Sequence, residues 1–332
     1  MKVSPAFCPY TQCTAHRSRP FRYQHRGRYS RRCDGRSVPR FQCLECRRFF
    51  SSQSFRLDFG LHRPGLLSPL FGVFISKVTL RQAARVLSCS RGTVARQLDR
   101  LGEHCRDFHR DVLRRSRRAG ALRGSWMLDE LETFEHSRRL APLTVPVLIE
   151  SGTYFVLDLE VDTLPARGRL APALREKKRA RAALLGVRRN RSQDAVSRCL
   201  DTLQASTLRG ARVVIATDRK PSYVGALRRR FGGALRHSRH SSTAVRNYKN
   251  PLFPINHTLA MLRDGLSRLV RRTWATTKSA LRLERHLWIW VCWRNYLRGI
   301  TNKAPATTPA MALGLLHLQL RRRLLLARRV FP

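Results

Sequence analysis

Residues 125–135 read SWMLDELETFE and residues 211–218 read ARVVIATD, and both stretches have the length and composition of buried β-strands. Alternation along the first strand puts Asp129 on the opposite face from Glu130. The second strand ends at Asp218, and strand ends of this kind carry the functional groups of open α/β sheets. Because unpaired carboxylates are costly in a strand, these acids predict either a metal site or pairing with arginines.

A metal site of this kind needs two or three carboxylates, supplied by neighbouring strands and a helix. Beyond Asp218 the chain holds only two more acids, Asp264 and Glu284. We expect Asp129, Asp218 and Glu284 to be the catalytic residues and to bind Mg²⁺ or Mn²⁺, with Asp264 as the reserve for the third position. Two such ions support in-line phosphoryl transfer without a protein nucleophile.

The stretches around these acids follow the order typical of a mixed sheet. Residues 124–163 predict a meander of about three strands. Residues 193–208 predict a helix, and amphipathic patterns predict two more helices over residues 257–273 and 277–298. The expected class is therefore α/β, with a mixed sheet flanked by helices.

The charge of the chain indicates a polyanionic partner. Its 332 residues include 66 Lys plus Arg against 21 Asp plus Glu, a formal net charge of +45. Nucleic acid is the natural partner, and an anionic membrane surface is the alternative. No apolar stretch reaches the roughly 18 residues of a spanning helix, so we expect no membrane span. Residues 165–192 contain ten basic residues and one acid, which predicts a mobile or helical insertion that either touches DNA or forms a solvated face.

The N-terminal residues 1–60 carry two close cysteine pairs, about thirty residues apart. Converging pairs of this kind bind a tetrahedral Zn²⁺, so we expect a zinc ribbon. Cys33 or His16 is the alternative for one ligand position. Arg47 and Arg48 follow the second pair and are expected to contact DNA. The expected zinc ligands are Cys8, Cys13, Cys43 and Cys46.

Residues 75–118 predict a helix-turn-helix. Leu80, Ala83 and Leu87 share one helical face, and Ser88-Cys89-Ser90 supplies a turn before the next helix. The alternative is an antiparallel helical hairpin without a DNA-binding role. Donor side chains at the start of the second helix would meet the major groove, and they are Ser90, Arg91, Thr93, Arg96 and Gln97.

Taken together, these motifs resemble bacterial insertion-sequence transposases of the DDE type, over nearly the whole chain. The resemblance implies a ribonuclease H-like catalytic domain over residues 122–300, followed by a basic tail or helix over residues 301–332. It also implies binding of terminal inverted repeats and Mg²⁺-dependent cleavage and strand transfer. Besides the cysteine pairs and the helix-turn-helix, it rests on RFQCLECRRFFSSQSF (40–55), LDELETF (128–134), ATDRKPSY (216–223) and NHTLAMLRDGLSRLVRRTWATTKS (256–279).

The resemblance maps the first two acids of the family onto Asp129 and Asp218. Relatives carry the third acid, a Glu, very soon after a Ser/Thr-Lys-Ser element. Here Lys278 and Ser279 are followed by two apolar residues, and Glu284 stands further along. This shift leaves open a weakened or inactive enzyme.

The resemblance also implies partners and a location. Double-stranded DNA, as element ends and as target, is the expected partner, with a homo-oligomer forming when two ends are brought together. The chain leads from Met1 straight into a cysteine pair, so we expect no secretory leader and a reducing, nucleoid-associated location in a bacterial cytoplasm. Two alternative functions remain, a non-catalytic DNA-binding regulator and a decayed transposase that binds DNA without cutting it.

Overall fold

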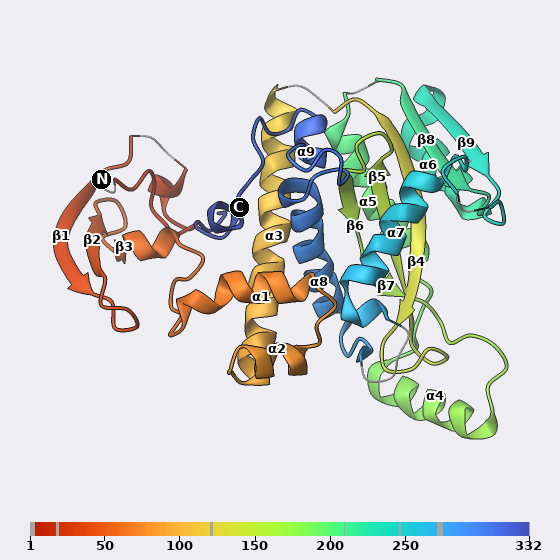
Figure 1. The fold of residues 1–332 in the computed structure, drawn as a ribbon, viewed down its shortest axis with the longest axis horizontal. Helices are drawn as coiled ribbons and strands as arrows, with labels where there is room; N and C mark the ends of the chain where they lie inside the picture. Colours follow the sequence, from red (N-terminus) through yellow and green to blue (C-terminus); the bar gives the residue numbers. More distant parts are fainter. Residues whose placement is uncertain are drawn as a thin grey trace. The chain divides into compact units, whose positions relative to one another are not determined.

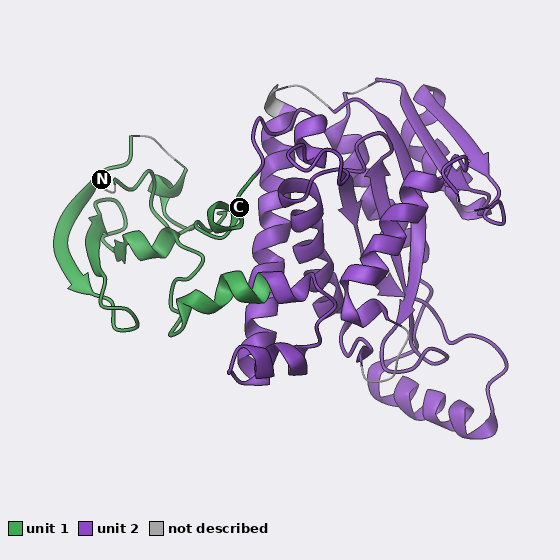
Figure 2. Ribbon diagram, in the orientation of Figure 1, with its two compact units in different colours: residues 1–71, 320–332 green, residues 72–319 purple. Residues whose placement is uncertain are grey.

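The computed structural model describes residues 4–17, 20–119, 122–208, 210–245, 247–270 and 275–331. The chain forms two compact units (Figure 2). The smaller unit comprises Met1–Phe71 together with Leu320–Pro332, and the larger unit comprises Gly72–Gln319. The end of the chain therefore belongs with its beginning.

The smaller unit is built on an antiparallel sheet in the order β1-β2-β3. Its core is a small cluster of cysteine and aromatic side chains, in which Phe41 stacks on Phe50 with ring centroids 5.4 Å apart. So small a core gives little stability by apolar burial alone. The strands are β1 (Tyr23–Ser30), β2 (Ser37–Cys43) and β3 (Phe49–Ser51), and 3-10 helices cover Thr14–His16, Ser52–Phe55 and Pro64–Leu66.

The C-terminal residues join this small core through Phe331. Its ring centroid lies 5.2 Å from that of Phe7 and 5.8 Å from that of Phe55. The Arg329 amide also donates to the Phe55 carbonyl at 2.9 Å. These aromatic contacts give the last residues of the chain, which include helix α10 (Arg322–Leu325), a structural place beside the N-terminal sheet.

The larger unit contains a mixed sheet in the order β6-β5-β4-β8-β9, with β7 paired to β5 (Figure 1). The first three strands along the chain form an antiparallel meander, and β8 and β9 run parallel to β4. The predicted α/β class is confirmed, and the sheet is consistent with a ribonuclease H-like fold. The strands are β4 (Ser125–Phe134), β5 (Pro142–Glu150), β6 (Val156–Leu159), β7 (Asp162–Thr163), β8 (Val213–Asp218) and β9 (Leu235–His240).

Burial explains which of these strands the sequence reveals. β5 is buried along its whole length, and β8 alternates between buried and half-buried residues, so both carry a clear apolar pattern. β9 reads LRHSRH, and none of its residues is buried. It forms because the backbone of β8 supplies hydrogen-bonding partners along its length. The hydrophobic periodicity of the sequence therefore does not predict this strand.

Helices flank the sheet of the larger unit. α5 contacts β5 and β6, α7 contacts β4, and α3 packs along α8 (Figure 1). Among the described residues no helix has the length and apolar character needed to cross a membrane. The helices are α1 (Leu67–Phe74), which spans the division between the units, α2 (Leu80–Val86), α3 (Arg91–Ala119), α4 (Pro172–Leu185), α5 (Ser192–Ser206), α6 (Pro221–Phe231), α7 (Phe253–Gly265), α8 (Ala280–Cys292) and α9 (Pro309–Ala312), with short 3-10 helices at Gly232–Ala234 and Ser267–Leu269 and a π-helix at Trp293–Leu297.

The helix predicted over residues 257–273 is displaced in the structure. It begins at Phe253, four residues earlier, because Pro254 is well suited to a first helical turn. It ends at Gly265, and a short 3-10 helix follows. Residues 271–273 of the prediction lie outside the described part of the chain.

The last long helix, expected over residues 277–298, begins at Ala280. The Ser279 hydroxyl accepts the Arg282 amide at 3.4 Å, which caps its first turn. Its α-helical part ends at Cys292 and passes into the π-helix. The prediction therefore found the helix and missed this change of hydrogen-bond pattern.

Helices α3 and α8 are anchored to β6 by buried polar contacts. The His109 ring lies 2.9 Å from the Leu157 carbonyl oxygen. Asn295, just after α8, accepts the Val156 amide at 3.0 Å and donates to its carbonyl at 2.8 Å. Burial lowers the pKa of His109 to about 4, so its ring is neutral near pH 7. These contacts satisfy buried backbone groups that would otherwise be costly.

Candidate metal centres and nucleic-acid interface

Asp129 and Asp218 lie on neighbouring strands of the mixed sheet. β4 and β8 are parallel, and Leu128 is paired with Thr217, so the next residue on each strand is one of the two aspartates. Residues in register on parallel strands project to the same face, and adjacent strands lie about 4.8 Å apart. The two half-buried carboxylates therefore share one face of the sheet.

Backbone amides orient both carboxylates. Asp129 accepts the amide of Glu130 at 2.7 Å, and Asp218 accepts the amide of Lys220 at 3.0 Å. Tyr223 on α6 is buried near these acids. Its pKa is raised well above the usual value, first by burial and then by the charges of Glu130, Asp129 and Asp218.

A polar cluster on the other face of β4 ties this strand to the loop after Asp218. The Glu130 carboxylate, whose side chain is 8% exposed, accepts hydrogen bonds from Ser192 and from the Lys220 ammonium group. Lys220 also donates to the Ser192 hydroxyl at 3.2 Å. Since the Lys220 amide holds Asp218 and its side chain holds the neighbour of Asp129, Lys220 links the two acids. The sequence gives no sign of this role, because Lys220 is one of 66 basic residues.

We predict that Lys220→Met lowers the free energy of unfolding by about 1–3 kcal/mol, because it leaves the Glu130 carboxylate in a nearly buried site without its cation. Chemical denaturation of the full chain would measure this loss. Adding Glu130→Gln to the same chain should recover part of the stability, since the pair then loses both charges together. Additive losses in the double variant would show that the two side chains do not act as a pair.

Glu284 lies one turn into α8, on the side that faces α3. Its carboxylate is 3.6 Å from the Arg106 guanidinium group on that helix. Burial, and then the charge of Glu160, raise the pKa of Glu284. Within the described residues, the carboxylates of Asp129, Asp218 and Glu284 do not gather within 4.8 Å of one another. Packing of α8 against α3 gives Glu284 a basic partner, Arg106.

Two further residues bear on the third position. Asp264, the reserve, has a side chain that is 85% exposed and lies 3.4 Å from the Lys77 ammonium group. His240 on β9 is in register with Asp218, so the two side chains share a face of the sheet. His240 could not be predicted from the sequence, since its strand has no apolar alternation.

The structure brings four cysteines of the smaller unit together, from the loop before β1 and from the turn between β2 and β3. The sulfur atoms of Cys8 and Cys46 are 3.8 Å apart, as are those of Cys13 and Cys43, and all four lie within 4.8 Å of one another. A tetrahedron with Zn–S bonds of about 2.3 Å has S–S edges of about 3.8 Å. The separations are far longer than a disulfide bond of about 2.05 Å. This donor set therefore fits Zn²⁺.

The alternative ligands lie elsewhere. Cys33 is in the β1–β2 turn, where its sulfur is 3.9 Å from a carboxylate oxygen of Asp34. His16 uses its Nδ1 on the Cys8 carbonyl oxygen at 2.6 Å. Burial raises the pKa of the Cys8 thiol, so a thiolate at this position needs a compensating cation.

Exposed arginines and aromatic rings surround the turn that carries the second cysteine pair. Arg48 lies over the Tyr10 ring at 5.2 Å, and Arg40 lies over the exposed Phe49 ring at 4.7 Å. Arg47 is exposed and has a positive φ of 59°. Guanidinium groups held on flat rings are suited to phosphates and to base stacking.

The predicted helix-turn-helix consists of α2 and the start of α3. The Thr79 hydroxyl caps α2 in a capping box with Gln82. Ser90 accepts the Thr93 amide at 3.0 Å and so caps α3, and the Arg96 guanidinium donates to the Thr93 hydroxyl at 3.3 Å. Ser90, Arg91 and Arg96 are exposed and Thr93 is half-buried, so this turn offers donors to solvent.

Gln97 is the exception among the expected DNA-contacting residues. Its side chain is buried, with 8% of its surface exposed. It stands three residues after Val94 and four before Leu101, both fully buried, and this spacing puts it on the apolar side of α3. Because α3 runs on to Ala119 and packs against α8, that side is turned inward. The expectation that Gln97 is exposed is therefore wrong.

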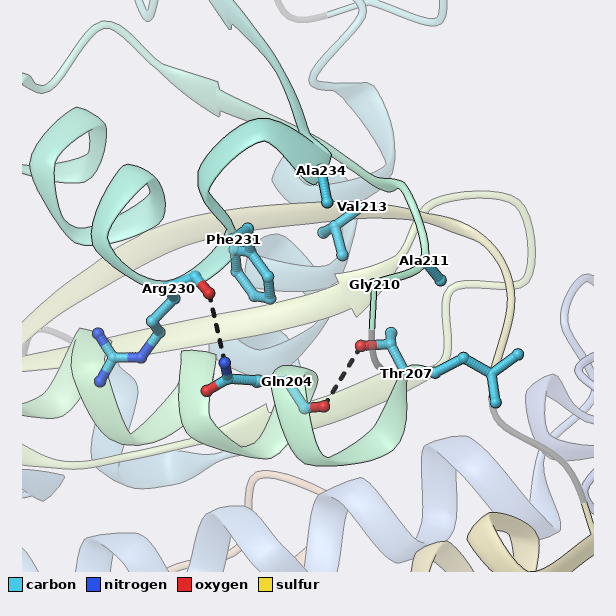
Figure 3. Close-up of a pocket in the computed structure, with 9 residues that line it drawn as sticks. Gln204, Thr207, Gly210, Ala211, Val213, Arg230, Phe231 and Ala234 are labelled. Carbon is cyan, nitrogen blue, oxygen red and sulfur yellow. Dashed lines mark hydrogen bonds between the residues drawn. The ribbon is translucent and has the colours of Figure 1, made fainter.

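A hollow of about 350 Å³ lies away from the acids (Figure 3). Its lining includes Gln204 and Thr207 from the end of α5, Arg230 and Phe231 from α6, and Val213. Val213 is the first residue of β8, and Asp218 is the last. The hollow is therefore at the opposite end of that strand from the carboxylates and takes no part in their site.

The acids, the sheet order and the cysteine cluster define a protein of the mixed α/β class with two candidate metal centres. No known protein family matches the chain, and no curated protein matches it. One solved structure to which it is similar is the catalytic domain of the Mos1 mariner transposase, at 18% sequence identity and a TM-score of 0.25. The match covers 60% of this chain and 91% of that one. So low a TM-score assigns no function.

Proposed function

We propose that this chain is a DNA transposase of the DDE type, of the bacterial insertion-sequence kind. In this proposal Asp129 and Asp218 bind Mg²⁺ or Mn²⁺, and the chain cuts and joins DNA at terminal inverted repeats. The observation that carries it is the placement of the two aspartates side by side on parallel strands of a mixed sheet. The net charge of +45 supports a DNA substrate.

The donor set of Asp129 and Asp218 suits a hard divalent cation. Carboxylate oxygens are the ligands that Mg²⁺ and Mn²⁺ prefer, and strand register brings two of them together. When bound, the ions would activate a water or 3′-hydroxyl and stabilise the leaving oxygen. The contribution of the chain is to hold the carboxylates in place, through the amides of Glu130 and Lys220.

The DNA-binding part of the proposal rests on the cysteine cluster and the start of α3. Zn²⁺ on the four thiols would hold the turn that presents Arg47 and Arg48. The donors at Ser90, Arg91 and Arg96 would meet the major groove or its phosphates. Two chains are then expected to assemble when two element ends are joined, in a bacterial cytoplasm.

A second candidate is a DNA-binding regulator, or a decayed transposase, that does not cut. The observation that favours it is the placement of Glu284, which pairs with Arg106. Among the described residues, the carboxylates of Asp129, Asp218 and Glu284 do not all lie within 4.8 Å of one another. Such a protein would need no divalent ion at the aspartate pair. Metal binding therefore separates the two candidates.

We predict that calorimetric titration of the zinc-loaded chain with Mn²⁺ reveals a site that Asp129→Asn abolishes. The matched control is Glu132→Gln, on the same strand but exposed and paired with Arg167, which should leave Mn²⁺ binding unchanged. Wild-type chain that shows no Mn²⁺ site would favour the regulator. Equal loss in both variants would mean that charge in general, and not the aspartate pair, attracts the ion.

A further inference from the structure

The basic insertion forms a helix that stands apart from the core of the larger unit. α4 covers Pro172–Leu185, and none of its residues is buried. Figure 1 shows it beyond the end of the sheet towards which β4 runs. A helix with no buried face gains nothing from packing, and isolated helices of this length are marginal in water. A stable α4 therefore needs a binding partner other than the core of its own unit.

Ion pairs hold the segments before and after α4, residues 165–171 and 186–192, to the end of β4. Arg167 donates to Glu132 at 2.8 Å, and Arg188 lies 3.1 Å from Glu135. Arg188 also donates to the carbonyl oxygens of Leu164 and Pro142 at 3.0 and 2.9 Å. The insertion is therefore held at its base. Since β4 and β8 are parallel, that base is at the same end of the sheet as Asp218.

Four cations on α4 itself differ from Arg167 and Arg188 in their ion pairing. Within the described residues, no ion pair involves Lys177, Lys178, Arg179 or Arg181. The first three are exposed, and Arg181 is half-exposed. Glu132 and Glu135 at the end of β4 thus neutralise Arg167 and Arg188, while these four cations of the helix form no ion pair within the described residues.

The spacing of these cations destabilises the helix in isolation. Lys177 and Arg181 are four residues apart, as are Arg175 and Arg179, and like charges at this spacing repel one another on a helix surface. Lys178 adds a cation three residues from both Arg175 and Arg181. Glu176 is the single acid of the helix. A polyanion laid along the helix would turn this repulsion into attraction.

We propose that α4 is a clamp for the phosphate backbone of duplex DNA, and that it holds the duplex where it passes towards Asp129 and Asp218. The inference rests on the proposed function and adds a contact surface to it. A helix of 14 residues is about 21 Å long, and a duplex of that length carries about twelve phosphates. Each of the four cations thus has a phosphate within reach. The contact depends on the charge of the duplex and not on its base sequence.

The test is the salt dependence of duplex binding by the full chain, with Lys177, Lys178, Arg179 and Arg181 all changed to Ala. Fluorescence anisotropy with a duplex of roughly 30 base pairs, about three helical turns, would be measured without divalent metal. The slope of log K against log salt should become shallower by about 0.9 for each lost phosphate contact, and so by about 3–4 in total. The shift should be equal for duplexes with and without element ends.

The matched control keeps every charge and exchanges the residue types: Lys177→Arg, Lys178→Arg, Arg179→Lys and Arg181→Lys in one chain. This control should keep the wild-type slope. A wild-type slope in the Ala variant would overturn the clamp while leaving the transposase proposal intact. A wild-type chain that binds no duplex at all would overturn the transposase proposal as well.

Two other partners, a second protein chain and single-stranded RNA, can be distinguished from duplex DNA by experiment. Leu184, Leu185 and Val187 at the end of α4 are exposed by 81, 68 and 77%, which a second protein chain could cover. Changing all three to Ser should leave the salt slope unchanged. If the Ser variant loses its oligomers in light scattering and the Ala variant keeps the wild-type slope, α4 makes protein contacts and the clamp is overturned. Binding of single-stranded RNA but not of duplex DNA through the four cations would overturn it too.

Discussion

The Asp218→Asn variant is expected to cut and join DNA carrying the element ends about 10³-fold more slowly than the wild-type chain in Mg²⁺. The amide has the shape of the carboxylate and still accepts the Lys220 amide, but it brings no negative charge to a divalent ion. Losing several kcal/mol of transition-state stabilisation corresponds to this factor. The measurement is the single-turnover rate of nicking, with duplex affinity recorded alongside and expected to stay at the wild-type level.

Two control variants sharpen this result. Asp264→Asn makes the same chemical change at an exposed acid beside Lys77 and should keep the full rate. Glu284→Gln decides the third position: a loss as large as that of Asp218→Asn would make Glu284 a ligand, and a full rate would leave it as the partner of Arg106. Equal nicking by wild type and Asp218→Asn would end the catalytic assignment.

Replacing Cys43 by Ser is expected to release the metal and unfold the smaller unit. Structural zinc contributes about 10–16 kcal/mol to the folding of zinc-finger peptides, more than so small an aromatic core can replace. A hydroxyl is a poor substitute for a thiolate on zinc. The checks on the full chain are its zinc content and the hydrogen-exchange protection of β2 and β3, both of which should be lost.

The matched control for this variant is Cys33→Ser. Cys33 sits outside the four-sulfur cluster, so this change should keep both the zinc and the exchange protection. A Cys43→Ser chain that retains zinc and slow exchange would show that the four sulfurs are not the ligands. Loss of zinc in the Cys33→Ser chain would restore that residue as a ligand.

Local chemistry explains why some site residues could be predicted. Asp129 lies within an apolar strand and Asp218 ends another, and a strand is recognisable from its own residues. The capping residues Thr79 and Ser90 accept amides three residues away, so neighbouring residues in the sequence also determine where α2 and α3 begin. The cysteine pairs are close in sequence, and their metal preference is a property of the thiol.

Long-range packing explains the residues that could not be predicted. Glu284 is the expected third acid, and its contact with Arg106, which is 178 positions earlier in the chain, could not be read from the sequence. Gln97 has the spacing of a recognition-helix donor, but the packing of α3 buries it. His240 shares a face with Asp218 only because β9 adds to the edge of β8.

By itself the sequence determined the strands that carry the two aspartates, the caps of α2 and α3, the four cysteines and the excess of positive charge. Each of these depends on the nature of a side chain and on neighbours within a few residues. Tertiary structure alone decided that Lys220 holds Glu130, that Glu284 faces α3, and that four cations of α4 form no ion pair with any described residue. The reason is that a charge takes the nearest partner in space, and distance in space is set by how the elements pack.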